Sequence, residues 1–164
     1  MSKRIVLDPL DRRPATAYRN RVTDSKRPPA SSRPPGDAGR ITFRFLTPSI
    51  LEVVWSGYIT RASCGHYPEQ LAAMFTRAGP DASIRYAIFD AQRVTGFTAD
   101  SRIPGGQLLD MCKRAGARRV IVVTNSSAVR MIGSTVALAT GMSIRFVQSP
   151  GDALEEIRRL ERHS

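Results

Sequence analysis

The sequence predicts an α/β fold: one domain with a mixed, mostly parallel five-stranded sheet and about four helices, preceded by a disordered basic arm. Two observations support this prediction. Short apolar segments typical of strands alternate with longer segments whose apolar residues recur at helical spacing, which favours a parallel sheet covered by helices. The length of 164 residues fits one such domain and a tail, and excludes a large barrel or a multi-domain enzyme. We place the arm at residues 1–40 and the domain at residues 41–164.

The charge distribution separates the arm from the domain. The chain has 25 Lys and Arg against 14 Asp and Glu, a net charge of +11. Residues 1–40 hold ten basic and four acidic residues, a net +6, whereas the domain carries +5. The arm also holds six of the eleven prolines and few large apolar residues. It therefore cannot bury enough apolar surface to offset an ordering entropy of roughly 1–2 kcal/mol per residue, and we predict that it is disordered.

The chain shows no targeting or membrane signal. The arm lacks the apolar run of a secretory signal peptide, and its four aspartates and repeated prolines argue against an organellar transit peptide. No segment is apolar over the length that a membrane-spanning helix needs. We therefore expect a cytoplasmic protein with no transmembrane segment. In that compartment Cys64 and Cys112 are expected to be reduced thiols, with a disulfide between them as the alternative.

The first part of the domain is predicted to be a hairpin followed by a helix. Residues 41–45 alternate apolar and polar side chains, as a half-buried strand does, and a turn at Pro48 leads into a second strand at residues 50–55. Pro68 fits the first turn of a helix, which Gly79 then ends.

Three further strands, each followed by a helix, complete the predicted domain. The strands are predicted, in order, at residues 84–90, 120–123 and 143–147. A loop is predicted at residues 91–98. The helices are predicted from Asp100 or Ser101 to Ala115, from the capping residues 125–127 to Thr140, and from a capping-box-like segment at residues 149–152 onward. The middle helix is expected to direct four apolar residues inward: Val129, Ile132, Val136 and Ala139.

The sequence offers little catalytic chemistry. It contains neither a GxGxxG nor a GxxxxGK[ST] motif, so the usual phosphate-binding loops are absent. Cys64 and His66 form the closest approach to a metal site, and a metal ion needs more ligands than these two. Cys112 falls on the apolar face of a helix, and Asp90 and Asp100 are interpreted as a loop residue and a helix cap. We predict no catalytic residue, no cofactor and no metal site.

Four segments of the domain together carry the pattern of one known family. They are residues 86–101, the strand at residues 119–123, residues 127–130, which open a helix, and residues 145–154, around the last strand. These segments resemble STAS domains, the family that includes the SpoIIAA-like anti-sigma factor antagonists and their bacterial relatives. The order of elements matches over about 120 residues. The resemblance implies a STAS-like domain in the C-terminal three quarters of the chain.

The resemblance also implies where a functional site lies. In the family, a Ser or Thr in a pattern like Asp-Ser-Ser/Thr-Gly follows the central strand, and a kinase that doubles as the anti-sigma factor phosphorylates it. Aligned without a gap, the pattern falls on residues 98–101, and Asp100 occupies the acceptor place. Shifted by two residues, it falls on residues 100–103, and Arg102 occupies that place. Neither register provides the standard phosphoacceptor.

We therefore predict a non-enzymatic regulatory module that binds a partner protein. Its predicted contact residues are Phe97, Thr98, Asp100, Ser101 and Arg102. Ser101 and Thr98 remain as nearby hydroxyls for phosphorylation. The partner implied by the family is a kinase-like anti-sigma factor or another signalling protein.

Two alternative functions remain open. The first is a small-ligand or lipid-binding STAS-like domain, which requires an apolar cavity. The second is a nucleic-acid or membrane-surface binder that acts through phosphate contacts of residues 1–40. Tyr18 is the only aromatic residue of the arm, so base stacking is not indicated, and a solvated linker is the favoured interpretation.

Overall fold

Residues 38–79 and 83–163 are the part of the chain that the structure, a computed structural model, describes. The arm predicted over residues 1–40 lies outside this part up to residue 37. The described chain begins with Ala38, which forms a β-bridge to Tyr58. The next residue, Gly39, lies so close to Tyr58 that any Cβ there would overlap the Tyr58 carbonyl group.

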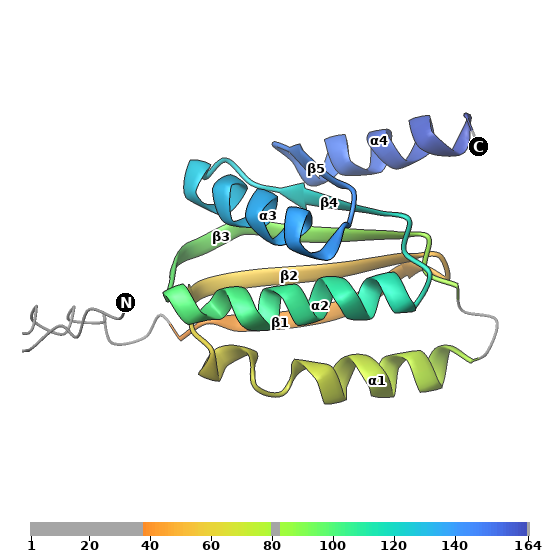
Figure 1. The fold of residues 1–164 in the computed structure, drawn as a ribbon. Helices are drawn as coiled ribbons and strands as arrows, with labels where there is room; N and C mark the ends of the chain where they lie inside the picture. Colours follow the sequence, from red (N-terminus) through yellow and green to blue (C-terminus); the bar gives the residue numbers. More distant parts are fainter. Residues whose placement is uncertain (1–37, 80–82, 164) are drawn as a thin grey trace, which may run out of the picture. The chain divides into compact units, whose positions relative to one another are not determined.

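Five strands form one sheet in which the order in space equals the order in the chain (Figure 1). The first two strands pair antiparallel, and every later pair is parallel. The strands are β1 (Arg40–Thr47), β2 (Ile50–Ile59), β3 (Tyr86–Phe97), β4 (Arg119–Val123) and β5 (Ile144–Val147). The predicted mixed, mostly parallel five-stranded sheet is confirmed.

Four α-helices cover the two faces of this sheet. Those that pack on one face are α1 (Tyr67–Ala78), α2 (Arg102–Arg114) and α3 (Ser127–Thr140), whereas α4 (Pro150–Glu161) packs on the other. The strands serve both faces by alternation: along β3, Ala87 and Phe89 belong to the core under α1 and α2, while Ile88 belongs to the core under α4. All four predicted helices are confirmed.

Local sequence accounts for the helix ends. Ser126 accepts a hydrogen bond from the Val129 N–H and so caps α3, and Gly141 ends that helix with a left-handed φ of 64°. At the start of α4, Ser149 and Asp152 each accept a hydrogen bond from the other's backbone N–H, at 3.1 Å in both directions. This is the capping box that the sequence predicted.

The predicted loop at residues 91–98 is wrong. β3 continues to Phe97, and β2 continues beside it to Ile59, so the two strands stay paired past the end of β4. The register shifts twice along this extension, between Val54 and Ser56 and between Gly57 and Tyr58. Pairing with β2 therefore overrides the weak local strand preference of these residues. As a result, β3 carries the chain to Phe97 before α2 begins.

The inward position predicted for Ala139 is also wrong, because Ala139 is exposed. The half-buried stripe of α3 passes from Val136 to Thr140, at a spacing of four residues instead of three. Val129 and Ile132 are half-buried as predicted, yet no residue of α3 is fully buried. This helix therefore covers its part of the sheet loosely.

Candidate functional site

The junction between β3 and α2 is the site that the sequence predicted. The Thr98 N–H donates to the Ile59 carbonyl oxygen at 2.9 Å, which ends the paired extension of β2 and β3. A 3₁₀ turn over Ala99–Ser101 then leads directly into α2 at Arg102. The five predicted contact residues therefore share one short turn between strand and helix.

Both hydroxyl groups of this junction face inward. Ser101 is only 7% exposed, and its Oγ donates to the Thr98 carbonyl oxygen at 2.7 Å. The Ser101 N–H donates to the same carbonyl oxygen at 3.1 Å. The Thr98 Oγ1 atom is buried and has no hydrogen-bond partner among the described residues. Phosphorylation of either residue would thus require the junction to open.

The charged residues of the junction face outward. Asp100 and Arg102 are both exposed, although the Arg102 Nε–H donates to the Ala99 carbonyl oxygen at 2.9 Å. Phe97 is half-buried between this surface and the apolar residues beneath it. Asp100 and Arg102 therefore present fixed charges to solvent at the start of α2.

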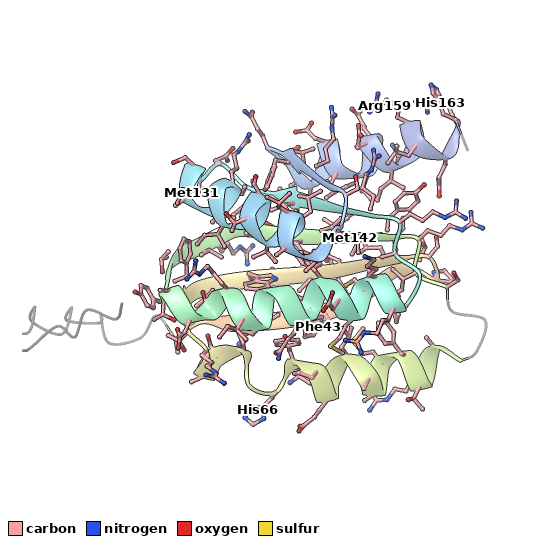
Figure 2. All side chains as sticks on the ribbon, viewed as in Figure 1. Phe43, His66, Met131, Met142, Arg159 and His163 are labelled. Atoms are coloured by element: carbon pink, nitrogen blue, oxygen red, sulfur yellow. The ribbon has the colours of Figure 1, made fainter. Side chains whose placement is uncertain are left out.

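An apolar surface that the sequence analysis missed lies beside these charges. A groove of about 670 Å³ runs between α2 and α3 and includes Asp100, Arg102, Ile103 and Val136 in its lining. Ile103 is 53% exposed. Met131 and Leu138 of α3 are also exposed, at 67% and 87%, but they do not line this groove (Figure 2 labels Met131). The signal in the sequence was the presence of large apolar residues outside the inward-facing stripes of both helices.

The two cysteines are buried within the described domain. Both thiols are free, and burial raises the pKa of Cys112 to about 12. Burial also raises the pKa of Cys64. Because the thiolate is the nucleophilic form, neither side chain is activated for covalent catalysis at neutral pH. Nearby, the Tyr67 hydroxyl donates to the Pro104 carbonyl oxygen and so connects α1 to the first turn of α2.

The described residues contain no cluster of three or more His, Cys, Asp or Glu side chains that could hold a metal ion. Cys64 and His66 accordingly have no third ligand within that part of the chain. In the same residues, none of the helices has both the length and the apolar character needed to cross a membrane.

The opposite face of the sheet carries an ion-pair cluster centred on Glu156. This α4 carboxylate is 8% exposed, and it accepts a hydrogen bond from Arg159 at 2.8 Å. Arg145 and Arg119 lie 3.4 and 3.8 Å from the same carboxylate oxygen. The hydrogen bond from Arg159, together with the three positive charges, lowers the pKa of Glu156. The cluster joins α4 to β4 and β5, so we interpret it as structural.

Comparison with solved structures finds this arrangement of strands and helices in known proteins. A protein of the DUF3478 family with a SpoIIAA-like fold, from Shewanella loihica PV-4, matches with a TM-score of 0.51 and 16% identity, over 72% of this chain and 94% of that one. The anti-sigma factor antagonist SpoIIAA in its unphosphorylated form matches with a TM-score of 0.53 and 13% identity, over 72% and 97% of the two chains. An anti-sigma factor antagonist from Mycobacterium paratuberculosis matches with a TM-score of 0.53 and 15% identity, over 75% and 97%.

The domain therefore has the α/β fold that these solved structures share. More particularly, it is a SpoIIAA-like fold, as the sequence resemblance implied. No family model matches the chain, and no curated protein matches it in sequence.

Proposed function

We propose that this chain is a non-enzymatic regulatory module that binds a partner protein through residues 97–102 and the adjacent groove between α2 and α3. The observation that carries the proposal is the exposed surface at the start of α2. There the opposite charges of Asp100 and Arg102 border the exposed apolar side chain of Ile103. A contiguous apolar surface with a polar rim is typical of protein interaction sites.

Two of the matched structures are anti-sigma factor antagonists, which supports a signalling protein as the partner. A kinase-like anti-sigma factor is the partner class that we favour, acting in the cytoplasm. The basic arm over residues 1–40 would tether the domain or add electrostatic attraction.

We further propose that binding is not switched by phosphorylation at this junction. The Ser101 hydroxyl donates a hydrogen bond to the Thr98 carbonyl oxygen, and the Thr98 hydroxyl is buried. Asp100 supplies instead a permanent negative charge close to the place where the family carries its phosphoacceptor. A phosphoryl group changes the local charge by about −2 and so can make or break an interface, whereas a fixed carboxylate cannot be removed.

Quantitative affinity purification tests the proposal. The full chain carries a tag and is expressed in its source organism as wild type, Asp100→Lys, Ile103→Asp and Glu155→Lys. Glu155 is an exposed residue of α4, so the last variant makes the same charge change on the opposite face. We expect at least tenfold lower recovery of one partner with the first two variants and unchanged recovery with Glu155→Lys. Equal recovery of every protein by all four chains would refute this interface.

A further inference from the structure

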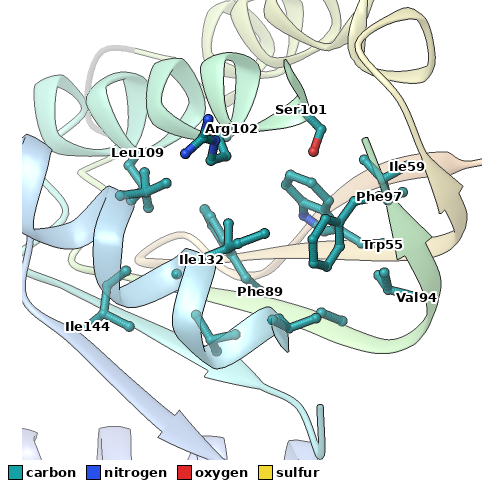
Figure 3. A pocket seen from close by; sticks show the side chains of 16 residues that line it. Trp55, Ile59, Phe89, Val94, Phe97, Ser101, Arg102, Leu109, Ile132 and Ile144 are labelled. Carbon is teal, nitrogen blue, oxygen red and sulfur yellow. The ribbon is translucent and has the colours of Figure 1, made fainter. Parts of the chain in front are cut away.

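A cavity lies between the sheet and the two helices α2 and α3 (Figure 3). Its volume is about 110 Å³. β2 contributes Trp55 to its lining, β3 contributes Phe89, and α3 contributes Ile132. Ser101 and Arg102 at the start of α2 are the only residues with a polar or charged side chain in the lining, apart from the indole N–H of Trp55. The interior is thus apolar, with polar groups near one end.

The helices leave this volume open instead of packing it closed. The inward side chains of α3 remain half-buried because they line the cavity. Gly105 of α2 also lines it, and a Cβ at that position would meet no atom within 4 Å. A glycine inside a helix costs about 1 kcal/mol relative to alanine, and close packing does not require this one. Gly105 therefore lowers the stability of α2 at a position where a larger side chain would reduce the volume of the cavity.

Trp55 adds a specific chemical feature. Its Nε1 atom is buried and has no acceptor among the described residues. A buried N–H without a partner is destabilising, and most such groups in folded proteins are paired. Trp55 lines the cavity, although Nε1 itself has almost no accessible surface, so an acceptor on a molecule held there completes this hydrogen bond once the indole ring shifts toward it.

We propose that the cavity binds a small, uncharged, apolar molecule that carries one hydrogen-bond acceptor for the Trp55 indole N–H. An apolar protein cavity of about 150 Å³ holds benzene, which has six non-hydrogen atoms, so this smaller one suits a molecule of about four or five non-hydrogen atoms. A lipid acyl chain needs several times that volume. The inference thus narrows the small-ligand alternative to compact molecules, and it does not rest on partner binding.

Two probes of nearly equal shape test the proposal: cyclobutanone, which has an acceptor oxygen, and methylenecyclobutane, which has a CH₂ group in its place. Trp55 is the only tryptophan, so the indole N–H of the ¹⁵N-labelled full chain gives one signal to follow. We expect cyclobutanone to move this signal downfield and to bind about tenfold more tightly than the hydrocarbon. No binding of either probe would overturn the proposal, and equal affinities would overturn the role of Trp55.

Two substitutions at one position supply the control. Gly105→Leu extends a side chain from a point with open space around it, whereas Gly105→Ala adds only one methyl group there. Both changes improve helix propensity, so both variants are expected to fold with raised Tm. Gly105→Leu should lower the affinity for cyclobutanone at least tenfold, and Gly105→Ala should change it less than threefold. Unchanged affinity in Gly105→Leu would place the probe elsewhere, and Asp100→Lys, which disrupts the proposed interface, should leave probe binding intact.

Discussion

Replacing Gly105 and Gly106 together with alanine should raise the thermal stability of the domain. Each glycine lies inside α2, where alanine is favoured by about 0.8–1 kcal/mol because its backbone loses less freedom on folding. The added methyl groups have room: a Cβ at Gly105 meets nothing within 4 Å, and one at Gly106 first meets Val136 Cγ1 at 3.8 Å. Neither methyl group therefore opposes the gain in helix propensity.

The expected size of this effect follows from the two positions together. They should contribute about 1.5–2 kcal/mol, since neither methyl group meets a close neighbour. For a domain of this length, 1 kcal/mol shifts Tm by about 4 °C, so we expect a rise of about 6–8 °C. Differential scanning calorimetry and urea denaturation of the double variant both measure it. The urea midpoint should increase with an unchanged slope.

Gly133→Ala is the matched control on α3. A Cβ there would lie 3.1 Å from two atoms of the Phe146 ring, which is tighter than ordinary contact. The gain in helix propensity is therefore offset, and we expect no increase in Tm or a decrease. If the α2 double variant were no more stable than Gly133→Ala, the open space beside Gly105 would not exist as described.

Three further predictions concern other parts of the domain. Glu156→Gln should lower Tm by about 2–4 °C at pH 7. Because the folded-state pKa of Glu156 is depressed, its contribution is present above the ordinary value of 4.5 and is lost as pH falls through the folded pKa, so thermal melts of wild type and variant should converge in acid. Ser149→Ala should cost about 1 kcal/mol in urea denaturation by removing the α4 cap, whereas Ser134→Ala, at an exposed position of α3, should cost less than about 0.5 kcal/mol. Cys64 and Cys112 should resist iodoacetamide at pH 8 in the native protein and react only in urea; rapid labelling of the folded chain would contradict their burial.

The parts of the fold that could be predicted from sequence are those with local causes. The α4 capping box needs only Ser149 and Asp152 three residues apart, and the α2 core face needs only Leu108, Leu109 and Cys112 at helical spacing. The continuous apolar run of β4 likewise indicates a strand covered on both faces. Such patterns involve residues close together in the chain, so they can be interpreted without knowledge of tertiary contacts.

The errors arise where distant segments decide the outcome. Residues 91–97 are a strand only because β2 continues beside them, and the sequence pattern of the segment itself does not predict that pairing. Either Ala139 or Thr140 could continue the inward-facing stripe of α3. Only the position of the helix over the sheet decides that Thr140 is half-buried and Ala139 is exposed. The inward direction of the Ser101 hydroxyl depends on a turn whose shape the sequence did not predict.

The candidate site shows the same division. Its position in the chain follows from the resemblance, which aligns residues 98–103 with a family pattern, and its role stays a prediction. The neighbouring groove could not be foreseen, because Ile103 and Val136 line one groove only when α2 and α3 lie side by side. The cavity beneath them depends on how far α3 stands from the sheet, and sequence periodicity carries no such distance.

The two faces of the sheet differ in how completely they are packed. The α4 face is closed by fully buried residues such as Ile121 and Ala153, and by the cluster around Glu156. The α2–α3 face holds the apolar cavity, an unpaired indole N–H and exposed apolar side chains, each of which is a cost for a domain that only has to fold. Departures from good packing that gather in one place are expected at functional sites, where the rest of the structure supplies the stability. These departures share the face that Asp100 and Arg102 border, and this is the reason for proposing both the partner interface and the ligand site there.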